Sequence, residues 1–283
     1  MSTREQRIKV FEDTIDWIEK DSDLSASIGP AKKSTEVYYE DDYPSFDVNN
    51  KKDMKIVVTK HRSYEAAMLL HKEYPEKKIA VMNFANAFHA GGGVTMGAGA
   101  QEESLCRTST LYPLIYRRTL RDTFYRHHMY LDTPKASDSL IYTEGVIICK
   151  SDEDLPKRLE KKDWVKVDVI TIAAPDLRAS SNRYASLVGG GSFMNDAELF
   201  GYHVKRAIHM LTVAASKKAD ILVLGAFGCG AFKNDPSVVA KAYKIALSEF
   251  SQVFDRIEFA VYCRPGEETN YNAFRKAFTD TKI

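Results

Sequence analysis

The chain has 283 residues, of which 44% are hydrophobic and 28% are charged, and its formal net charge is +1. This near-neutral balance argues against a protein that binds nucleic acid or acidic membrane by bulk electrostatic attraction. No apolar run is long enough to span a membrane, and the N-terminus lacks a signal-peptide hydrophobic region, so we expect a cytoplasmic protein.

The first predicted element is an amphipathic helix over residues 4–20, because apolar residues recur every three or four positions from Ile8 to Ile18. Residues 21–53 are polar and irregular, with a short strand expected near 37–39. We therefore expect residues 1–53 to form an N-terminal helical extension packed on the core.

Short apolar strands alternate with helices in residues 54–283, which we expect to form the catalytic domain of a single structural unit. Strands are predicted at 56–58, 79–84, 140–142, 146–148, 167–173, 221–224 and 257–262. Helices are predicted at 62–71, 101–110, 113–127, 196–216, after Pro236 and from about 270. The segments 140–142 and 146–148 are expected to form a strand pair that turns at Glu144-Gly145.

The predicted strands lack a clean alternation of polar and apolar residues, which favours burial on both faces of a sheet. Helices lie between them in the sequence. Together these patterns predict an α/β fold, a three-layer α/β/α sandwich.

Two glycine-rich loops follow predicted strands, where open α/β sheets bind their ligands. The first spans 83–93 and ends in Gly91 to Gly93, whose missing side chains would let a ligand lie against bare backbone. The second spans 225–236, and its glycines would let consecutive amides form an anion-binding nest at a helix N-terminus. A diphosphate suits this arrangement.

Common nucleotide motifs fit the second loop poorly. The chain has no Gly-Lys-Ser/Thr tripeptide, as a P-loop requires, and Lys233 occupies the third glycine position of a dinucleotide fingerprint. A strand-to-helix turn without a ligand therefore remains an alternative interpretation of this loop.

Gln101, Glu102 and Glu103 open the helix that follows the first loop. Glutamates in the first turn of a helix commonly offset its dipole, which is the structural interpretation. Placed beside a ligand loop, they are also typical of general acid–base catalysis. Burial and mutual repulsion of the two carboxyl groups would raise a pKa far enough for one to hold a proton near neutral pH.

The ordered pattern of Gly91 to Gly93, seven residues and Gln101-Glu102-Glu103 resembles the signature of poly(ADP-ribose) glycohydrolases. Flanking stretches resemble the microbial-type branch of that family, including residues 83–87, 105–112, 169–175 and 224–236. One departure is Ala90, where this branch often has a proline. The resemblance implies a macrodomain fold with a mixed sheet, and exo-type hydrolysis of the ribose–ribose bond in ADP-ribose polymers.

Carried over by position, the resemblance implies that Glu103 is the catalytic acid and that Glu102 binds ribose hydroxyls. Asn86 with the three glycines would hold the terminal ribose, and Gly228 to Phe232 would wrap the diphosphate. The substrate-binding residues expected in full are Asn86, Gly91, Gly92, Gly93, Gln101, Phe227, Gly228, Cys229, Gly230, Ala231, Phe232 and Asn234. Tyr271 is a candidate for stacking on adenine, and Phe259 is expected in the core.

This chemistry needs no cofactor and no metal, because one carboxyl group can protonate the leaving oxygen and then accept a proton from water. The four cysteines are widely spaced, without a metal-ligand or disulfide pattern, and reduced thiols are expected. The expected partners are ADP-ribose polymers or ADP-ribosylated proteins, with no membrane and no obligate nucleic acid, and the expected state is a monomer. The resemblance also implies a role in reversing ADP-ribosylation in the DNA damage response.

Three rival functions remain open at this point. The protein could be a macrodomain that binds ADP-ribose without cutting it, or a hydrolase of mono-ADP-ribosyl substrates. A nucleotide-dependent transferase or dehydrogenase using residues 221–236 is a third, and the poor motif matches weigh against it.

Overall fold

The computed structural model describes residues 3–48, 52–131, 135–178 and 194–279. Its strands are β1 (Glu36–Tyr38), β2 (Lys55–Thr59), β3 (Ile79–Ala85), β4 (Leu140–Ile148), β5 (Val165–Ala173), β6 (Ile221–Leu224) and β7 (Arg256–Ala260). Its helices are α1 (Thr3–Lys20), α2 (Ser22–Lys33), α3 (Ser63–Glu73), α4 (Gln101–Thr108), α5 (Leu111–Ile115), α6 (Arg118–Leu120), α7 (Arg126–Leu131), α8 (Asp196–Ser216), α9 (Pro236–Ser248) and α10 (Thr269–Phe278). Two 3₁₀ turns, η1 (Val94–Met96) and η3 (Lys161–Asp163), and a π-helical turn, η2 (Arg121–Tyr125), are also present.

The strands form one sheet in the order β1-β4-β5-β3-β6-β7-β2. β4 runs antiparallel to both β1 and β5, whereas β5, β3, β6, β7 and β2 are parallel neighbours. The sheet is therefore mixed, as expected. Because β5, β3 and β6 are parallel, the loops that follow them meet at one edge of the sheet.

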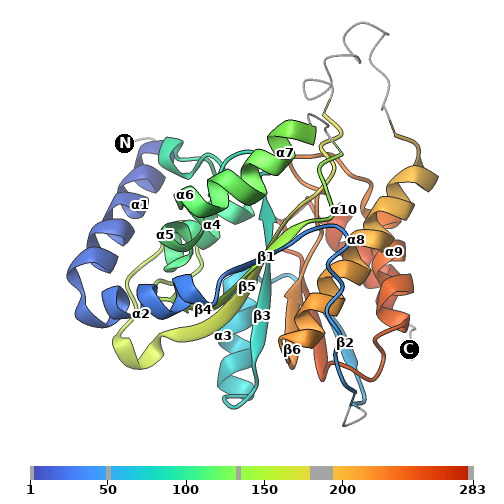
Figure 1. Ribbon diagram of the computed structural model, residues 1–283, viewed down its shortest axis with the longest axis horizontal. Helices are drawn as coiled ribbons and strands as arrows, with labels where there is room; N and C mark the ends of the chain where they lie inside the picture. The colour runs from blue at the N-terminus through green and yellow to red at the C-terminus, as the bar shows by residue number, and fades with distance from the viewer. Residues whose placement is uncertain (1–2, 49–51, 132–134, 179–193, 280–283) are drawn as a thin grey trace, which may run out of the picture.

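Helices cover both faces of this sheet, with α1 to α5 on one side and α8 to α10 on the other (Figure 1). Successive residues of a strand point to opposite faces. Accordingly, Val81 of β3 packs in one buried cluster with Leu105 of α4, and Met82 packs in a second with Met210 of α8. All four residues of β6 are buried. The predicted three-layer α/β/α sandwich is confirmed.

Helix α2 corrects the expectation that residues 21–53 are irregular apart from one short strand. The Asp21 carboxylate accepts hydrogen bonds from the amides of Asp23 and Leu24, at 3.0 and 3.1 Å, and so caps the helix. Leu24 and Ala31 are buried. This packing outweighs the low helix propensity of Gly29 and Pro30, the two residues that suggested a loop. The strand expected near 37–39 is β1, an edge strand of the sheet.

Two other element predictions were wrong in detail. The helix expected over 113–127 is divided among α5, α6, η2 and α7, and the extended Arg117, with φ −131°, separates α5 from α6. The strand pair expected to turn at Glu144-Gly145 is the single strand β4. Gly145, with φ 77°, lies in a bulge where the pairing with β5 shifts between Thr143 and Val146.

None of the described helices combines the length and the apolar character that crossing a membrane requires.

Candidate active site

The two glycine-rich loops lie at the same edge of the sheet, after the neighbouring strands β3 and β6. The two loops are in contact where they begin, because the rings of Phe84 and Phe227 pack together with their centroids 5.8 Å apart. A side chain at Gly225 would come within 2.8 Å of the Phe84 ring, so the loops meet at close packing distance. The two glycine-rich loops therefore begin side by side at one edge of the sheet.

Glu102 is anchored through both of its carboxylate oxygens. Its Oε2 accepts a hydrogen bond from the Asn86 amide at 2.8 Å, and its Oε1 accepts from the Gly91 amide at 3.2 Å. The side-chain amide of Asn83 donates to Oε1 as well, at 3.4 Å. Glu102 is 3% exposed. Its carboxyl group thus ties the first glycine loop to α4 and β3.

Glu103 is held differently. Its Oε1 accepts from the Gly93 amide at 2.9 Å. Its Oε2 is buried and has no hydrogen-bond partner among the residues that the structure describes. A buried polar atom without a partner is costly and calls for an explanation, such as a catalytic role or a bound water. Of the two acids, only Glu103 has a carboxylate oxygen without a hydrogen-bond partner among the described residues.

Burial raises the pKa of Glu102 from its ordinary value of 4.5 to about 8, with the neighbouring Glu103 charge adding to the effect. The amide donors of Asn86 and Gly91 oppose this shift. Near neutral pH Glu102 therefore retains its proton.

This raised pKa predicts that the protein loses stability as the pH rises. Between the unfolded and folded pKa of Glu102, the folded state binds the extra proton, so the free energy of unfolding falls by up to about 1.4 kcal/mol per pH unit. We expect urea unfolding at about pH 5, 6.5 and 8 to show a shallower decline for Glu102→Gln than for wild type. Parallel profiles would contradict the buried proton.

The three glycines let the loop fold over the acids. A Cβ at Gly92, where φ is 55°, would lie 2.5 Å from Glu103 Oε1, and one at Gly91 would lie 2.7 Å from the Tyr112 ring. The amides of Gly91 and Gly93 bond to the acids, and that of Gly92 donates to the carbonyl of His89 at 2.9 Å. The expected contact of bare backbone with ribose stays a prediction, since the protein itself uses all three amides.

Gln101 and Asn86 also bond within the protein. The Gln101 oxygen accepts from the Phe84 amide at 2.9 Å, and its nitrogen donates to the carbonyl of Met82 at 2.7 Å and to Ser63 at 3.0 Å. Asn86 Oδ1 accepts hydrogen bonds from the amides of Phe88 and His89. In this structure Gln101 positions α4 against β3, and Asn86 shapes the loop.

The second loop differs, because its amides are available. Among the amides that donate no hydrogen bond to any described residue are those of Gly228, Gly230, Ala231 and Phe232. Gly228 adopts φ 75°, and Lys233, at the missing third glycine, adopts φ 62°. Free amides in consecutive positions are what an anion-binding nest requires. The predicted diphosphate loop is supported by this geometry.

Cys229 and Phe227 are packing residues of the second loop. Cys229 is 9% exposed, and burial raises the pKa of its thiol, which disfavours a thiolate nucleophile. Phe227 is fully buried. Phe259 lies in the core, as expected, and Tyr271 carries Lys60 Nζ 4.9 Å above its ring. The adenine-stacking role of Tyr271 stays a prediction.

Asn234 fastens the second loop to the segment after β5. Its amide nitrogen donates to the carbonyl of Pro175 at 2.7 Å, and its oxygen bonds to His203 Nε2 at 2.7 Å. Arg178, from the same segment as Pro175, lies over the Phe232 ring at 5.2 Å. Sequence analysis matched residues 169–175 to the family but assigned this segment no role at the site.

Replacing Asn234 tests this fastening. Because the side chain is 2% exposed, Asn234→Ala leaves buried partners unsatisfied, and we expect the free energy of unfolding to fall by about 2 kcal/mol. Denaturant titration measures the loss, with Asn272→Ala, at an exposed asparagine of α10, as the matched control. Equal stability of the two variants would show that the contacts contribute little.

The rim of the first loop is clamped by α1 and by Arg107, which sequence analysis did not single out. Arg107 is 4% exposed and donates to the carbonyl of Ala98 at 2.7 Å. Thr14 of α1 bonds in turn to the carbonyl of Arg107 at 2.6 Å. Side chains at Gly97 and Gly99 would collide with α1, at Arg4 and Arg7. The alternating small residues 97–100 were the available signal for this close packing.

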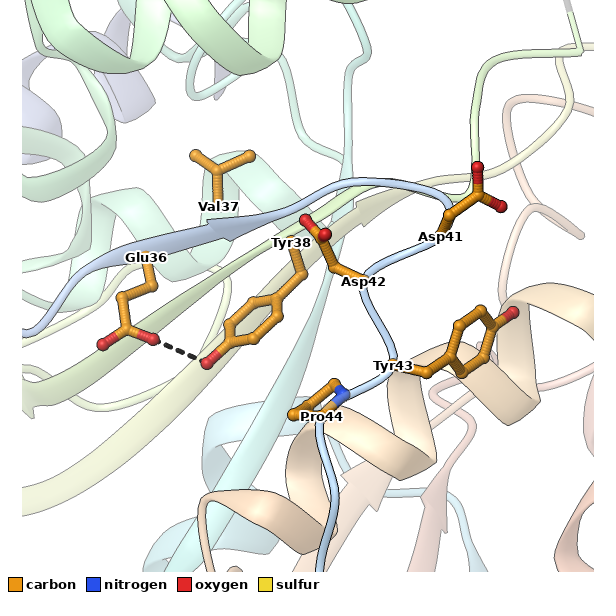
Figure 2. A pocket seen from close by; sticks show the side chains of 7 residues that line it. All are labelled: Glu36, Val37, Tyr38, Asp41, Asp42, Tyr43 and Pro44. Atoms are coloured by element: carbon orange, nitrogen blue, oxygen red, sulfur yellow. Dashed lines mark hydrogen bonds between the residues drawn. The ribbon is translucent and has the colours of Figure 1, made fainter.

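A separate open pocket lies along β1 and the segment that follows it (Figure 2). The residues that line it are Glu36, Val37, Tyr38, Asp41, Asp42, Tyr43 and Pro44. The Tyr38 hydroxyl donates to Glu36 at 2.6 Å. Three carboxylates and no cation line this pocket, so its charge does not suit a diphosphate. The described residues contain no cluster of histidine, cysteine and carboxylate side chains placed to hold a metal ion.

Comparison with known proteins agrees with this geometry. Residues 13–151 match the family model described as the microbial-type PARG catalytic domain, where PARG is poly(ADP-ribose) glycohydrolase. The second glycine loop lies outside that range and is covered by structural matches. No curated protein sequence matches the chain.

Two solved structures cover nearly the whole fold. The poly(ADP-ribose) glycohydrolase of Thermomonospora curvata, bound to the inhibitor ADP-HPD, matches with a TM-score of 0.81 and 27% identity, over 97% of this chain and 100% of that one. The enzyme of Deinococcus radiodurans in complex with ADP-ribose matches with a TM-score of 0.75 and 27% identity, over 89% of this chain and 96% of that one. The fold is macrodomain-like, and the family model and the solved structures that the chain matches are those of glycosidases. Residues 13–151 thus match the microbial-type poly(ADP-ribose) glycohydrolase family, and the fold is similar to solved poly(ADP-ribose) glycohydrolases over nearly the whole chain.

Proposed function

We propose that this protein hydrolyses the ribose–ribose O-glycosidic bond of poly(ADP-ribose), mainly from the free end of the chain, and releases ADP-ribose. Glu103 acts as general acid and then as general base. The observation that carries this assignment is the contrast between the acids: the described residues engage both oxygens of Glu102 but only one of Glu103.

The reaction follows from this arrangement. As the bond between the anomeric carbon and the leaving oxygen stretches, positive charge develops on the terminal ribose, and Glu103 transfers its proton to the leaving oxygen. Water then adds to the anomeric carbon and returns a proton to the Glu103 carboxylate. The products are free ADP-ribose and a polymer shortened by one unit, and the enzyme ends in its starting protonation state.

Glu102 supports this cycle in two ways. Its bonds to the Asn86 and Gly91 amides fix the loop that carries Gly93, the anchor of Glu103. Its carboxyl group, with a pKa raised to about 8, also limits the negative charge beside the reacting acid. The lone pairs of Glu102 that accept no amide hydrogen bond are available to the hydroxyls of the terminal ribose. Binding these hydroxyls is the role that the family resemblance implies for Glu102.

The free amides of the second loop are proposed to hold the diphosphate. Four such amides, from Gly228 and from Gly230 to Phe232, lie at the sheet edge shared with the acids. They neutralise phosphate oxygens by hydrogen bonding and keep the terminal ribose near Glu103, so binding energy is used to orient the scissile bond.

Incubation of the protein with purified poly(ADP-ribose), followed by chromatography of the products, tests the proposal. Release of monomeric ADP-ribose is expected, whereas longer fragments at early times would indicate cutting at internal bonds. Binding of polymer without any release would identify a reader, and release only from mono-ADP-ribosylated protein would identify a different hydrolase. Either result would overturn the assignment.

We also propose that the protein acts as a monomer in the cytoplasm and reverses ADP-ribosylation during the DNA damage response. The four free cysteines support a reducing compartment. The physiological role rests on similarity to the glycohydrolase family alone. Polymer levels in cells lacking the protein, measured after DNA damage, would test it.

A further inference from the structure

The first loop continues outward into a stack of tyrosines that leads away from the acids. The Tyr112 ring lies against Gly91, and a Cβ at that glycine would come within 2.7 Å of it. Tyr116 stacks on Tyr112, with ring centroids 5.0 Å apart and an interplanar angle of 11°. Tyr116 is 67% exposed. The Tyr116 ring is therefore exposed to solvent, and only Tyr112 lies between it and Gly91 of the first loop.

Arginines with incomplete charge compensation follow Tyr116 in the chain. Arg118, Arg121 and Arg126 all contact the carboxylate of Asp122, at 3.5, 3.4 and 2.9 Å. Each of the three arginine side chains is at least half exposed. One carboxylate cannot neutralise three guanidinium groups, so this surface has a positive surplus in a chain whose net charge is only +1.

Further basic groups lie next to these arginines in the chain and at the end of α2. Arg117 donates to the carbonyl of Lys32 at 3.0 Å, which brings the basic end of α2, Lys32 and Lys33, against the same surface. An exposed aromatic ring beside basic side chains is the combination that binds nucleotide chains, with bases stacking and phosphates paired to cations.

We propose that Tyr116, Arg118 and Arg121 bind the second ADP-ribose unit of the polymer, the unit that departs when the terminal bond breaks. This inference rests on the proposed function. The adenine of that unit stacks on Tyr116, and its diphosphate pairs with the arginines. The surface favours substrates with at least two units over mono-ADP-ribosylated protein, which has no second nucleotide.

Steady-state kinetics on poly(ADP-ribose) tests the proposal. Tyr116→Ala is expected to raise KM for polymer roughly tenfold, as loss of one stacked base predicts, and to leave kcat within about twofold. Its affinity for free ADP-ribose, measured by calorimetry, is expected to equal that of wild type. Tyr116→Phe keeps the ring and is expected to restore KM. Tyr130→Ala, at a tyrosine of α7 that is 81% exposed, is the matched control.

The double substitution Arg118→Gln with Arg121→Gln tests the phosphate contacts. We expect a higher KM and a weaker dependence of KM on salt, because fewer counterions are displaced when the polymer binds. Unchanged KM in all variants would overturn the inference while leaving hydrolysis by wild type intact. A weaker affinity of Tyr116→Ala for ADP-ribose itself would also overturn it, since Tyr116 would then act only through Tyr112.

Two further outcomes separate this inference from its alternatives. If wild type releases no ADP-ribose from polymer, the proposed function fails first, and the second-unit site fails with it. If the variants lose affinity for single-stranded DNA but keep the KM for polymer, the surface binds nucleic acid instead, which also overturns the inference.

Discussion

Replacing Glu103 by glutamine is expected to reduce the release of ADP-ribose from polymer by about 10²- to 10⁴-fold, the range that loss of a general acid produces. Glutamine has the same shape and can still accept a hydrogen bond from the Gly93 amide, so the loop should keep its conformation. It cannot supply a proton at the oxygen that has no partner in the structure. Affinity for ADP-ribose is expected to stay within a few-fold of wild type.

Single-turnover kinetics and calorimetry on the same preparation measure these two quantities separately. Glu102→Gln is the internal comparison, because that substitution disturbs an anchored carboxylate and should affect both loop stability and ribose binding. Turnover near the wild-type rate in Glu103→Gln would remove the assignment of Glu103. A loss of ADP-ribose affinity as large as the loss of rate would place Glu103 among the binding residues instead.

Substituting Gly92 by alanine is expected to disable the site although both glutamates remain in the sequence. The new methyl group would lie 2.5 Å from Glu103 Oε1, on a backbone at φ 55°. L-residues adopt such a φ at a cost of about 1–2 kcal/mol, and the collision must displace the carboxylate. Because a small displacement of a catalytic group has large kinetic consequences, we expect kcat to fall by about 10²-fold.

Gly201→Ala is the matched control, since nothing lies within 4 Å of the added methyl group in the middle of α8. Both variants should show a folded far-ultraviolet circular dichroism spectrum, and only Gly92→Ala should lose activity. Full activity in Gly92→Ala would mean that the loop opens during catalysis, so that the acids are not covered as the structure shows them.

The layered fold could be predicted because its strands are short, apolar and separated by strongly periodic helices. α8 and β6 have the bounds that the periodicity indicates. The failures lie where local signals conflict with packing. Gly29 and Pro30 indicated a loop, yet burial of Leu24 holds α2 together, and a bulge at Gly145 has the same sequence signature as a turn.

Candidate catalytic residues could be identified because their motif has a fixed spacing, but their separate roles came from the family resemblance and not from the residue types themselves. The same residue type occurs at 102 and 103, and only the hydrogen bonds distinguish an anchored carboxylate from one with a free oxygen. The role of the first glycines was likewise hidden. Whether a missing side chain makes room for a ligand or for the protein's own acid depends on three-dimensional contacts.

The close packing of α1 on the loop at Gly97 and Gly99 has a consequence for how the chain can be divided. A truncation that begins at residue 54 would remove the helix against which this loop rests, whereas the second loop, which follows β6, would remain in the fragment. Such a fragment, if it folds, would still bind ADP-ribose through the second loop but would lose the positioning of the first loop and the acids that hydrolysis requires. It would serve as a capture reagent for ADP-ribosylated proteins rather than as an eraser.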